Sequence, residues 1–95
     1  MALIHTSTTV GTTPTLLFTL PAGNPYTAVI IYNEDNSSIY VGDETVTTTG
    51  ADKGITIRKE QFAQIWLHAR EKLYAVSSVG TIPNGVTCLY SVVLD

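Results

Sequence analysis

The chain has 95 residues, which is enough for one domain and leaves little room for a second. Charged residues make up only 14% of the sequence and the formal net charge is −3, which argues against a sequence-independent grip on nucleic acid. The single cysteine, Cys88, excludes an internal disulfide and a zinc site built from several cysteines.

The N-terminal segment is the first element of the chain. Its start, Met1 to Thr6, lacks a basic region and a long apolar run, so we expect no signal peptide, and no apolar stretch reaches membrane-spanning length. We expect a strand over residues 3–10, with an extended N-terminal arm over residues 1–12 as the alternative. Such an arm can add a strand to the free sheet edge of a neighbour.

Turn signals then recur along the chain at intervals of roughly ten residues, a spacing typical of sandwiches and barrels. Between them Val, Ile, Tyr, Thr and Leu dominate, which favours a pleated, half-buried surface. We therefore expect an all-β fold: a single small β-sandwich or barrel, jelly-roll-like, with about seven to nine short, mainly antiparallel strands over residues 1–95. The expected strands are 3–10, 15–20, 27–33, 38–42, 45–49, 55–58, 62–69, 73–78 and 86–94.

Two turns define the middle and the end of this pattern. The runs 30–33 and 38–42 flank a polar turn, which predicts a β-hairpin. The first run belongs to a segment, 27–32, that is apolar on both faces, so this strand should lie centrally in its sheet. Near the C-terminus, Asn84-Gly85 tolerates positive φ at both residues, which predicts a sharp bend before the final strand.

The segment 58–72 has two interpretations. Its apolar residues also fit the stripe of a helix. We favour a strand over 62–69, because a tight turn at 70–72 would then pair it with the strand at 73–78. One face of that strand would carry Ala63, Ile65, Leu67 and Ala69, and the other Phe62, Gln64, Trp66, His68 and Arg70.

Side chains that support catalysis are sparse. A catalytic Cys–His pair could be formed only from Cys88 with His5 or His68, and the spacing of these residues matches no known motif. Cys88 also alternates with positions expected in the core. The acidic residues at 34–35 and 43–44 lack the regular spacing and the glycine of a calcium loop. We therefore expect no enzyme activity, no metal and no cofactor.

Aromatic residues are better candidates for binding. Trp66, the only tryptophan, lies two residues from both Gln64 and His68, which is typical of an interface anchor with a polar rim; the alternative is a plug in the core. Three tyrosines allow a platform for carbohydrate or, alternatively, ordinary cross-strand pairs. They are Tyr32, Tyr40 and Tyr74.

Charges are distributed unevenly along the chain. Residues 1–52 contain no Lys or Arg, and all five basic residues lie between Lys53 and Lys72. Most of the acidic residues lie upstream of them. This distribution suits either docking against a charged protein surface or solvated loops of both signs.

The order of these runs is similar to that of small β-structured virion proteins of tailed bacteriophages, of the capsid decoration (cement) and head-fibre type. In that group a strand ending in Asn is followed by a polar turn and a strand ending in Tyr-x-Gly. A Thr-rich loop with a glycine comes next, then a strand pair, a Leu-Tyr-Ala strand that ends in Ser, and a final β-strand. The matching segments here are 31–33, 39–42, 46–50, 54–57 and 73–77. Segment 59–70 departs from the pattern because it is more charged than the strand usual there, which would mark a contact specific to this protein.

The resemblance implies a virion component, made in the host cytoplasm and located on the capsid exterior. We expect a capsid decoration (cement) protein whose partners are the major capsid protein and itself, as a trimer or other small homo-oligomer, with no nucleic acid and no membrane. The alternatives are a tail or host-recognition module that binds carbohydrate, and a ring-forming head-completion or tail-tube subunit. The expected interface residues are Phe62, Gln64, Trp66, His68 and Arg70, together with Leu3 and His5.

Overall fold

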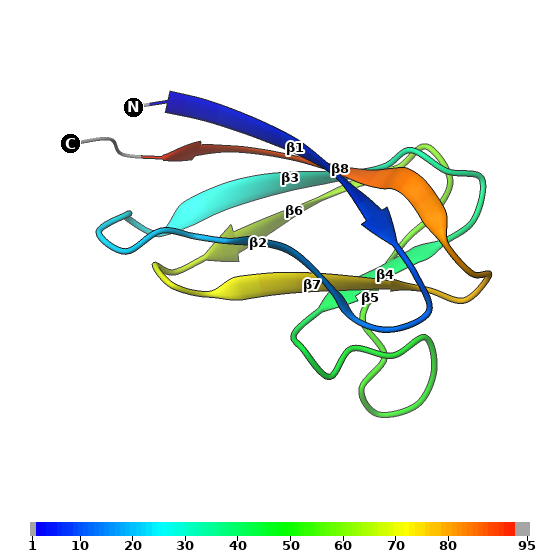
Figure 1. The fold of residues 1–95 in the computed structure, drawn as a ribbon. Coiled ribbons are helices and arrows are strands. Elements are labelled where there is room, and N and C mark those ends of the chain that lie inside the picture. The colour runs from blue at the N-terminus through cyan, green and yellow to red at the C-terminus, as the bar shows by residue number, and fades with distance from the viewer. Residues whose placement is uncertain (1, 93–95) are drawn as a thin grey trace.

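Two four-stranded sheets face each other and enclose the core of the protein (Figure 1). The computed structural model describes residues 2–92, and the regular structure in that range is all β-strand, which confirms the expected sandwich. The strands are β1 (Ala2–Val10), β2 (Thr15–Thr19), β3 (Thr27–Asn33), β4 (Ile39–Gly42), β5 (Ile55–Ile57), β6 (Phe62–Leu67), β7 (Lys72–Ser77) and β8 (Ile82–Val92). Within residues 2–92 no helix has the length and apolarity needed to cross a membrane.

The two sheets are built from nested antiparallel pairs. Sheet A has the order β1-β8-β3-β6 and sheet B the order β2-β7-β4-β5. β1 pairs with β8, β2 with β7, β3 with β6 and β4 with β5. The chain thus forms one long antiparallel hairpin with its tip between β4 and β5, and the hairpin is rolled up so that its strand pairs alternate between the two sheets. This is the jelly-roll arrangement of an eight-stranded sandwich. β3 lies between β8 and β6, the central position that its apolar sequence predicts.

Most consecutive strands lie in different sheets, so the expected hairpin between residues 30–33 and 38–42 is wrong: β3 is in sheet A and β4 in sheet B. The buried side chain of Asn33 fixes this crossing. Its amide donates to the carbonyl oxygens of Ser37 (2.7 Å) and Ile57 (2.9 Å), and its carbonyl oxygen accepts the N–H of Asp35 (2.8 Å). Side-chain hydrogen bonds of this kind replace the backbone ladder that a hairpin needs.

The connection from β6 to β7 also changes sheets, although the strand interpretation of residues 62–67 is confirmed. The turn after β6 is hydrogen-bonded to the end of β2: the N–H of Arg70 donates to Leu20 (2.7 Å), and the N–H of Leu20 donates to Glu71 (3.0 Å). Arg70 reverses the chain in a left-handed conformation with φ 71°. As a result β7 continues beside β2, and the expected pairing of β6 with β7 is wrong.

The strand expected at residues 45–49 is wrong, because this segment belongs to the loop between β4 and β5. The carboxylate of Asp43 accepts hydrogen bonds from the backbone N–H (2.9 Å) and the hydroxyl (2.6 Å) of Thr45. These local bonds favour a turn over an extended strand. Within this loop, Thr47 and Lys53 form an isolated β-bridge.

The N-terminal segment is part of the sandwich and not a free arm. β1 pairs with β8 from Ala2, opposite Val92, to Val10, opposite Ile82. The arm alternative is therefore wrong for residues 2–10, while Met1 lies outside the described residues.

The final strand is longer than expected, since β8 begins at Ile82 and not at residue 86. The bend at Asn84 exists, with φ 50°, but it lies inside the strand. Opposite it the register of β1 shifts between Thr8 and Val10, so the bend forms a bulge. Residues 93 and 94 of the expected strand lie outside the described range.

The core lies between the inner faces of the two sheets. Phe18 of β2 stacks on Tyr90 of β8 across the sandwich, with ring centroids 4.5 Å apart. Cys88 is fully buried, as its alternation with apolar positions predicts. The other large, fully buried apolar side chains are Val10, Leu20, Val29, Ile31, Ile39, Val41 and Val86.

Candidate binding face

One side of the sandwich brings together most of the contact residues expected from the sequence. In sheet A, alternate residues of each strand point away from the core. We refer to this surface as the outer face of sheet A. Its members are Leu3, His5 and Ser7 of β1, Thr87, Leu89 and Ser91 of β8, Ala28, Ile30 and Tyr32 of β3, and Phe62, Gln64 and Trp66 of β6.

The strand registers align these side chains in rows across the sheet. One row contains Phe62, Tyr32, Thr87 and Ser7, and the next contains Gln64, Ile30, Leu89 and His5. Opposite residues on one face of an antiparallel pair lie about 4.5–5.5 Å apart at Cβ. Segments 5–7 and 62–64, at the two edges of the sheet, therefore belong to one continuous surface.

Large apolar side chains on this face are exposed. The exposed fraction is 68% for Phe62, 67% for Leu3, 51% for Trp66 and 40% for Ile30. Trp66 is thus a surface residue and not a plug in the core. Several large apolar side chains exposed on one face of a sheet are a feature of binding surfaces.

Six of the seven expected contact residues lie on or beside this face, and Arg70 does not. His68 follows β6 and adjoins the face through its stacking on Tyr26. Arg70 lies in the next turn, where its left-handed conformation ends the strand alternation. It lines a separate surface depression with Asp43, Glu44, Lys72 and Tyr74.

An aromatic cluster occupies one end of the face. The Tyr26 ring lies 5.2 Å from the Trp66 ring and 4.3 Å from the His68 ring, measured between centroids. Tyr26 itself is 54% exposed. Sequence reasoning missed this residue, because only the pairing of Thr27 with Leu67 brings the start of β3 next to the end of β6.

The three tyrosines considered as a carbohydrate platform do not share a surface. Tyr32 belongs to sheet A, whereas Tyr40 and Tyr74 belong to β4 and β7 of sheet B. Tyr40 pairs with Thr56 and Val76. The platform interpretation of these tyrosines is therefore wrong.

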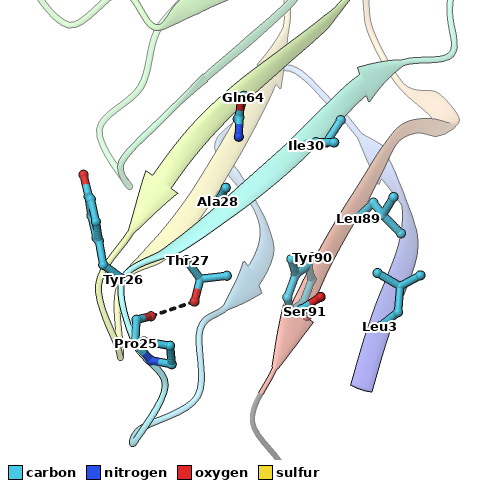
Figure 2. Close-up of a pocket in the computed structure, with 10 residues that line it drawn as sticks. All are labelled: Leu3, Pro25, Tyr26, Thr27, Ala28, Ile30, Gln64, Leu89, Tyr90 and Ser91. Carbon is cyan, nitrogen blue, oxygen red and sulfur yellow. Dashed lines mark hydrogen bonds between the residues drawn. The ribbon is translucent and has the colours of Figure 1, made fainter. Parts of the chain in front are cut away.

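A groove of about 360 Å³ opens between β3 and β8 (Figure 2). The ladder between these strands ends at Ile30 opposite Leu89, whereas β3 stays paired with β6 up to Thr27, and β8 with β1 up to Ala2. The sheet thus divides into two ribbons at this end, and the groove lies where they part. Its walls include Leu3, Tyr26, Ile30, Gln64, Leu89 and Ser91, which are mainly apolar with a few polar groups.

The outer face of sheet A carries no Asp, Glu, Lys or Arg. In residues 2–92 these side chains lie in loops and turns, apart from Lys72 in β7. Glu34 borders the face, where its carboxylate accepts the hydroxyl of Thr87 at 3.3 Å. The uneven charges of the sequence are thus loop charges, and the face itself suits an uncharged surface on its partner.

The groups considered for nucleophilic chemistry do not meet. Cys88 points into the core, and burial raises the pKa of its thiol to about 11, so the reactive thiolate is not formed at neutral pH. His5 and His68 are exposed on the opposite side of sheet A. Within residues 2–92, no three His, Cys, Asp or Glu side chains gather in a metal-binding arrangement.

Comparisons of the chain with known protein families, with curated proteins and with solved structures find no match. The candidate site is therefore defined by its physical features, which are a face with exposed apolar side chains, an aromatic cluster and an adjoining groove.

Proposed function

We propose that the protein is a capsid decoration protein of a tailed bacteriophage, which binds the outer shell non-covalently through the outer face of sheet A. The observation that carries this proposal is the group of large, exposed apolar side chains on that face, which bears no Asp, Glu, Lys or Arg. The similarity of the strand order to small virion proteins supports the phage setting. The jelly roll also occurs in viral capsid proteins, which supports the proposal by analogy of fold.

The composition of the face suits contact with a folded protein. The centres of protein interfaces are depleted of charge and enriched in aromatic residues. Each aromatic ring buries on the order of 150–250 Å² when it is covered, and Phe62 and Trp66 still expose more than half of their surfaces. Together with Leu3 and Ile30 they supply apolar contacts across the face, from β6 at one edge of sheet A to β1 at the other, for an interface of standard size, about 800 Å² per partner.

Such a contact stabilises a shell by repetition. A copy bound across the joint between neighbouring major capsid subunits loses its contacts when the joint opens. Because many equivalent joints carry a copy, modest individual contacts add up to strong resistance against rupture. The contact needs no bond chemistry, which agrees with a face that bears hydroxyl, amide, imidazole and apolar groups.

The test is sedimentation of the purified chain with shells assembled from the major capsid protein of the parent phage. We expect saturable binding at a number of copies comparable to the number of shell subunits. Phe62→Ala and Trp66→Ala should each weaken it, whereas Val79→Ala, which truncates an exposed side chain outside the face, should not. Absence of binding to shells, or binding of only a handful of copies as in a ring-forming subunit, would reject the proposal.

A second candidate function, binding of carbohydrate at a tail or on the host surface, is favoured by the cluster of Tyr26, Trp66 and His68 beside the groove. Aromatic faces stack on sugar rings. Phe62 lies four residues from Trp66 along β6, roughly 13 Å away. A sugar at the cluster would therefore depend on Trp66 and not on Phe62, whereas a protein surface would depend on both, and a glycan array with the two alanine variants separates the candidates.

A further inference from the structure

The edges of the two sheets differ in how they are protected against pairing with another strand. Exposed edges usually carry short strands, bulges, prolines or charges. β5 has only three residues. β2 has five residues, a register shift between Leu16 and Phe18, and the flanking prolines Pro14 and Pro21. β6 has six residues and is closed at both ends by left-handed residues, Glu60 and Arg70.

β1 is the exception among these edge strands. It has nine residues and contains no charged residue, no proline and no glycine. Residues 2–8 pair with β8 in continuous register, and the bulge comes only after Thr8. In the described range no strand pairs with its other side, so a long row of backbone N–H and C=O groups is available there. A long, regular and uncharged edge of this kind favours addition of a strand.

We propose that β1 pairs antiparallel with β1 of a second copy of this chain about a two-fold axis, so that the two four-stranded sheets A become one continuous sheet. A two-fold axis places a strand opposite the same strand of the second copy, so a charged residue in it would approach the identical charge of the other copy. β1 lacks such a residue, whereas the loops that surround β5 and β6 carry Lys53, Arg58 and Lys59.

The sequence of β1 is compatible with pairing to itself. A register centred on Thr6 pairs residues 3–9 of the two copies. It places Ile4 opposite Thr8 of the partner subunit and His5 opposite Ser7 of the partner subunit. Core-facing residues then lie opposite core-facing residues, and exposed opposite exposed, because both members of each pair have the same parity. Threonine and serine pairs across antiparallel strands are favourable.

The dimer goes beyond the proposed shell binding and does not depend on it. Its consequence is geometric: the two outer faces of sheet A join at β1 and present one uncharged surface of twice the width. A monomer that still binds shells would reject the dimer and leave the proposed function intact.

The experiment is sedimentation equilibrium of the isolated chain in a concentration series up to about 1 mM. We expect a monomer–dimer equilibrium for the wild type. Ser7→Lys and Ser7→Glu each place like charges roughly 8 Å apart in the dimer, within one Debye length at physiological salt, and should weaken it about three- to tenfold. Mixing the two variants should restore dimers, because opposite charges then meet.

Gln61→Lys is the matched control, since it adds the same charge to an exposed residue next to β6, at the opposite edge of sheet A from β1, and should leave the dimer unchanged. Far-UV circular dichroism checks that each variant is folded. Deletion of β1 is unsuitable, because it removes a strand of the sheet and bares Cys88 and Val86. A wild-type monomer, a trimer, a dimer insensitive to Ser7→Lys, or failure of the mixture to restore dimers would each overturn the proposal.

Discussion

Tyr26 and Trp66 lie with their ring centroids 5.2 Å apart on the solvent side of sheet A, although one residue precedes β3 and the other lies in β6. The contact fastens the start of β3 to the end of β6 beside the groove. Both rings remain more than half exposed, so they do not complete the core of the free chain. Their position supports the proposed binding role, because apolar rings at the surface gain burial only when a partner covers them.

The first prediction concerns Trp66. Trp66→Ala should weaken shell binding by about 2 kcal/mol or more, as expected for an aromatic anchor. The free energy of unfolding should fall by only about 1 kcal/mol or less, since the ring is 51% exposed and loses mainly its contact with Tyr26. Binding is measured by co-sedimentation and stability by urea unfolding. Unfolding of the free domain would contradict the surface role of this side chain.

The exposed side of β6 is an example of what the sequence predicts. Alternation with period two is a local property of a strand, so it identifies Phe62, Gln64 and Trp66 as one face without knowledge of the rest of the fold. The same holds for Leu3 and His5 in β1. That the two groups share a surface depends on the order of strands in sheet A, which local patterns do not specify.

The errors of the sequence analysis arise at residues whose partners are distant. The sequence predicts Asn33 as the end of a strand before a hairpin turn. In the structure its side chain binds the carbonyl oxygen of Ile57, and the chain continues in the other sheet. Arg70 reads as part of an alternating strand, but hydrogen bonds between its turn and Leu20 give it a different position. Tyr26 has no local signal, because its ring contacts come from β6 and the turn that follows it.

A second prediction concerns Asn33. Asn33→Ala leaves the buried carbonyl oxygen of Ile57, the partly buried carbonyl oxygen of Ser37 and the N–H of Asp35 without their partner, so the free energy of unfolding should fall by about 2–4 kcal/mol. Asn33→Asp should be at least as harmful at neutral pH, because a carboxylate would face the carbonyls of Ser37 and Ile57. Asn36→Ala, in the exposed part of the same turn, should change stability by about 0.5 kcal/mol or less. Equal stability of all three variants in urea titrations would show that the cross-sheet connection does not depend on this amide.

A third prediction concerns Gly54, which precedes β5. A Cβ atom at this position would overlap the carbonyl oxygen of Val41 and the side chain of Val46, and the backbone oxygen cannot rotate away. Gly54→Ala should therefore lower the free energy of unfolding by about 1–3 kcal/mol. At Gly11 an added Cβ meets only ordinary contact, 3.9 Å from the hydroxyl of Thr81, so Gly11→Ala should be neutral or slightly stabilising. Thermal and urea unfolding should thus show a loss of stability for Gly54→Ala and no loss for Gly11→Ala, and equal losses in the two variants would contradict the steric explanation.

The last prediction is a loss of stability in alkali. Burial raises the pKa of Cys88 from 9.0 to about 11, and burial also raises the pKa of Tyr90. Between these pH values the unfolded chain has lost the thiol proton while the folded chain retains it, so the unfolded state binds fewer protons and stability falls as pH rises. The stability that the protonated Cys88 contributes is fully present below pH 9, and about 2–3 kcal/mol of it is lost by pH 11.

Urea unfolding at several pH values between 8 and 11 measures this slope (~1.4 kcal/mol per pH unit from the thiol alone). Cys88→Ala removes the thiol and should flatten the slope, leaving the part of the Tyr90 contribution that comes from burial. The native thiol should also react slowly with iodoacetamide at pH 8, because it is fully buried and protonated. Alkylation at the rate of a free thiol in the folded protein, or an unchanged slope in the Cys88→Ala variant, would contradict the burial of this group between the sheets.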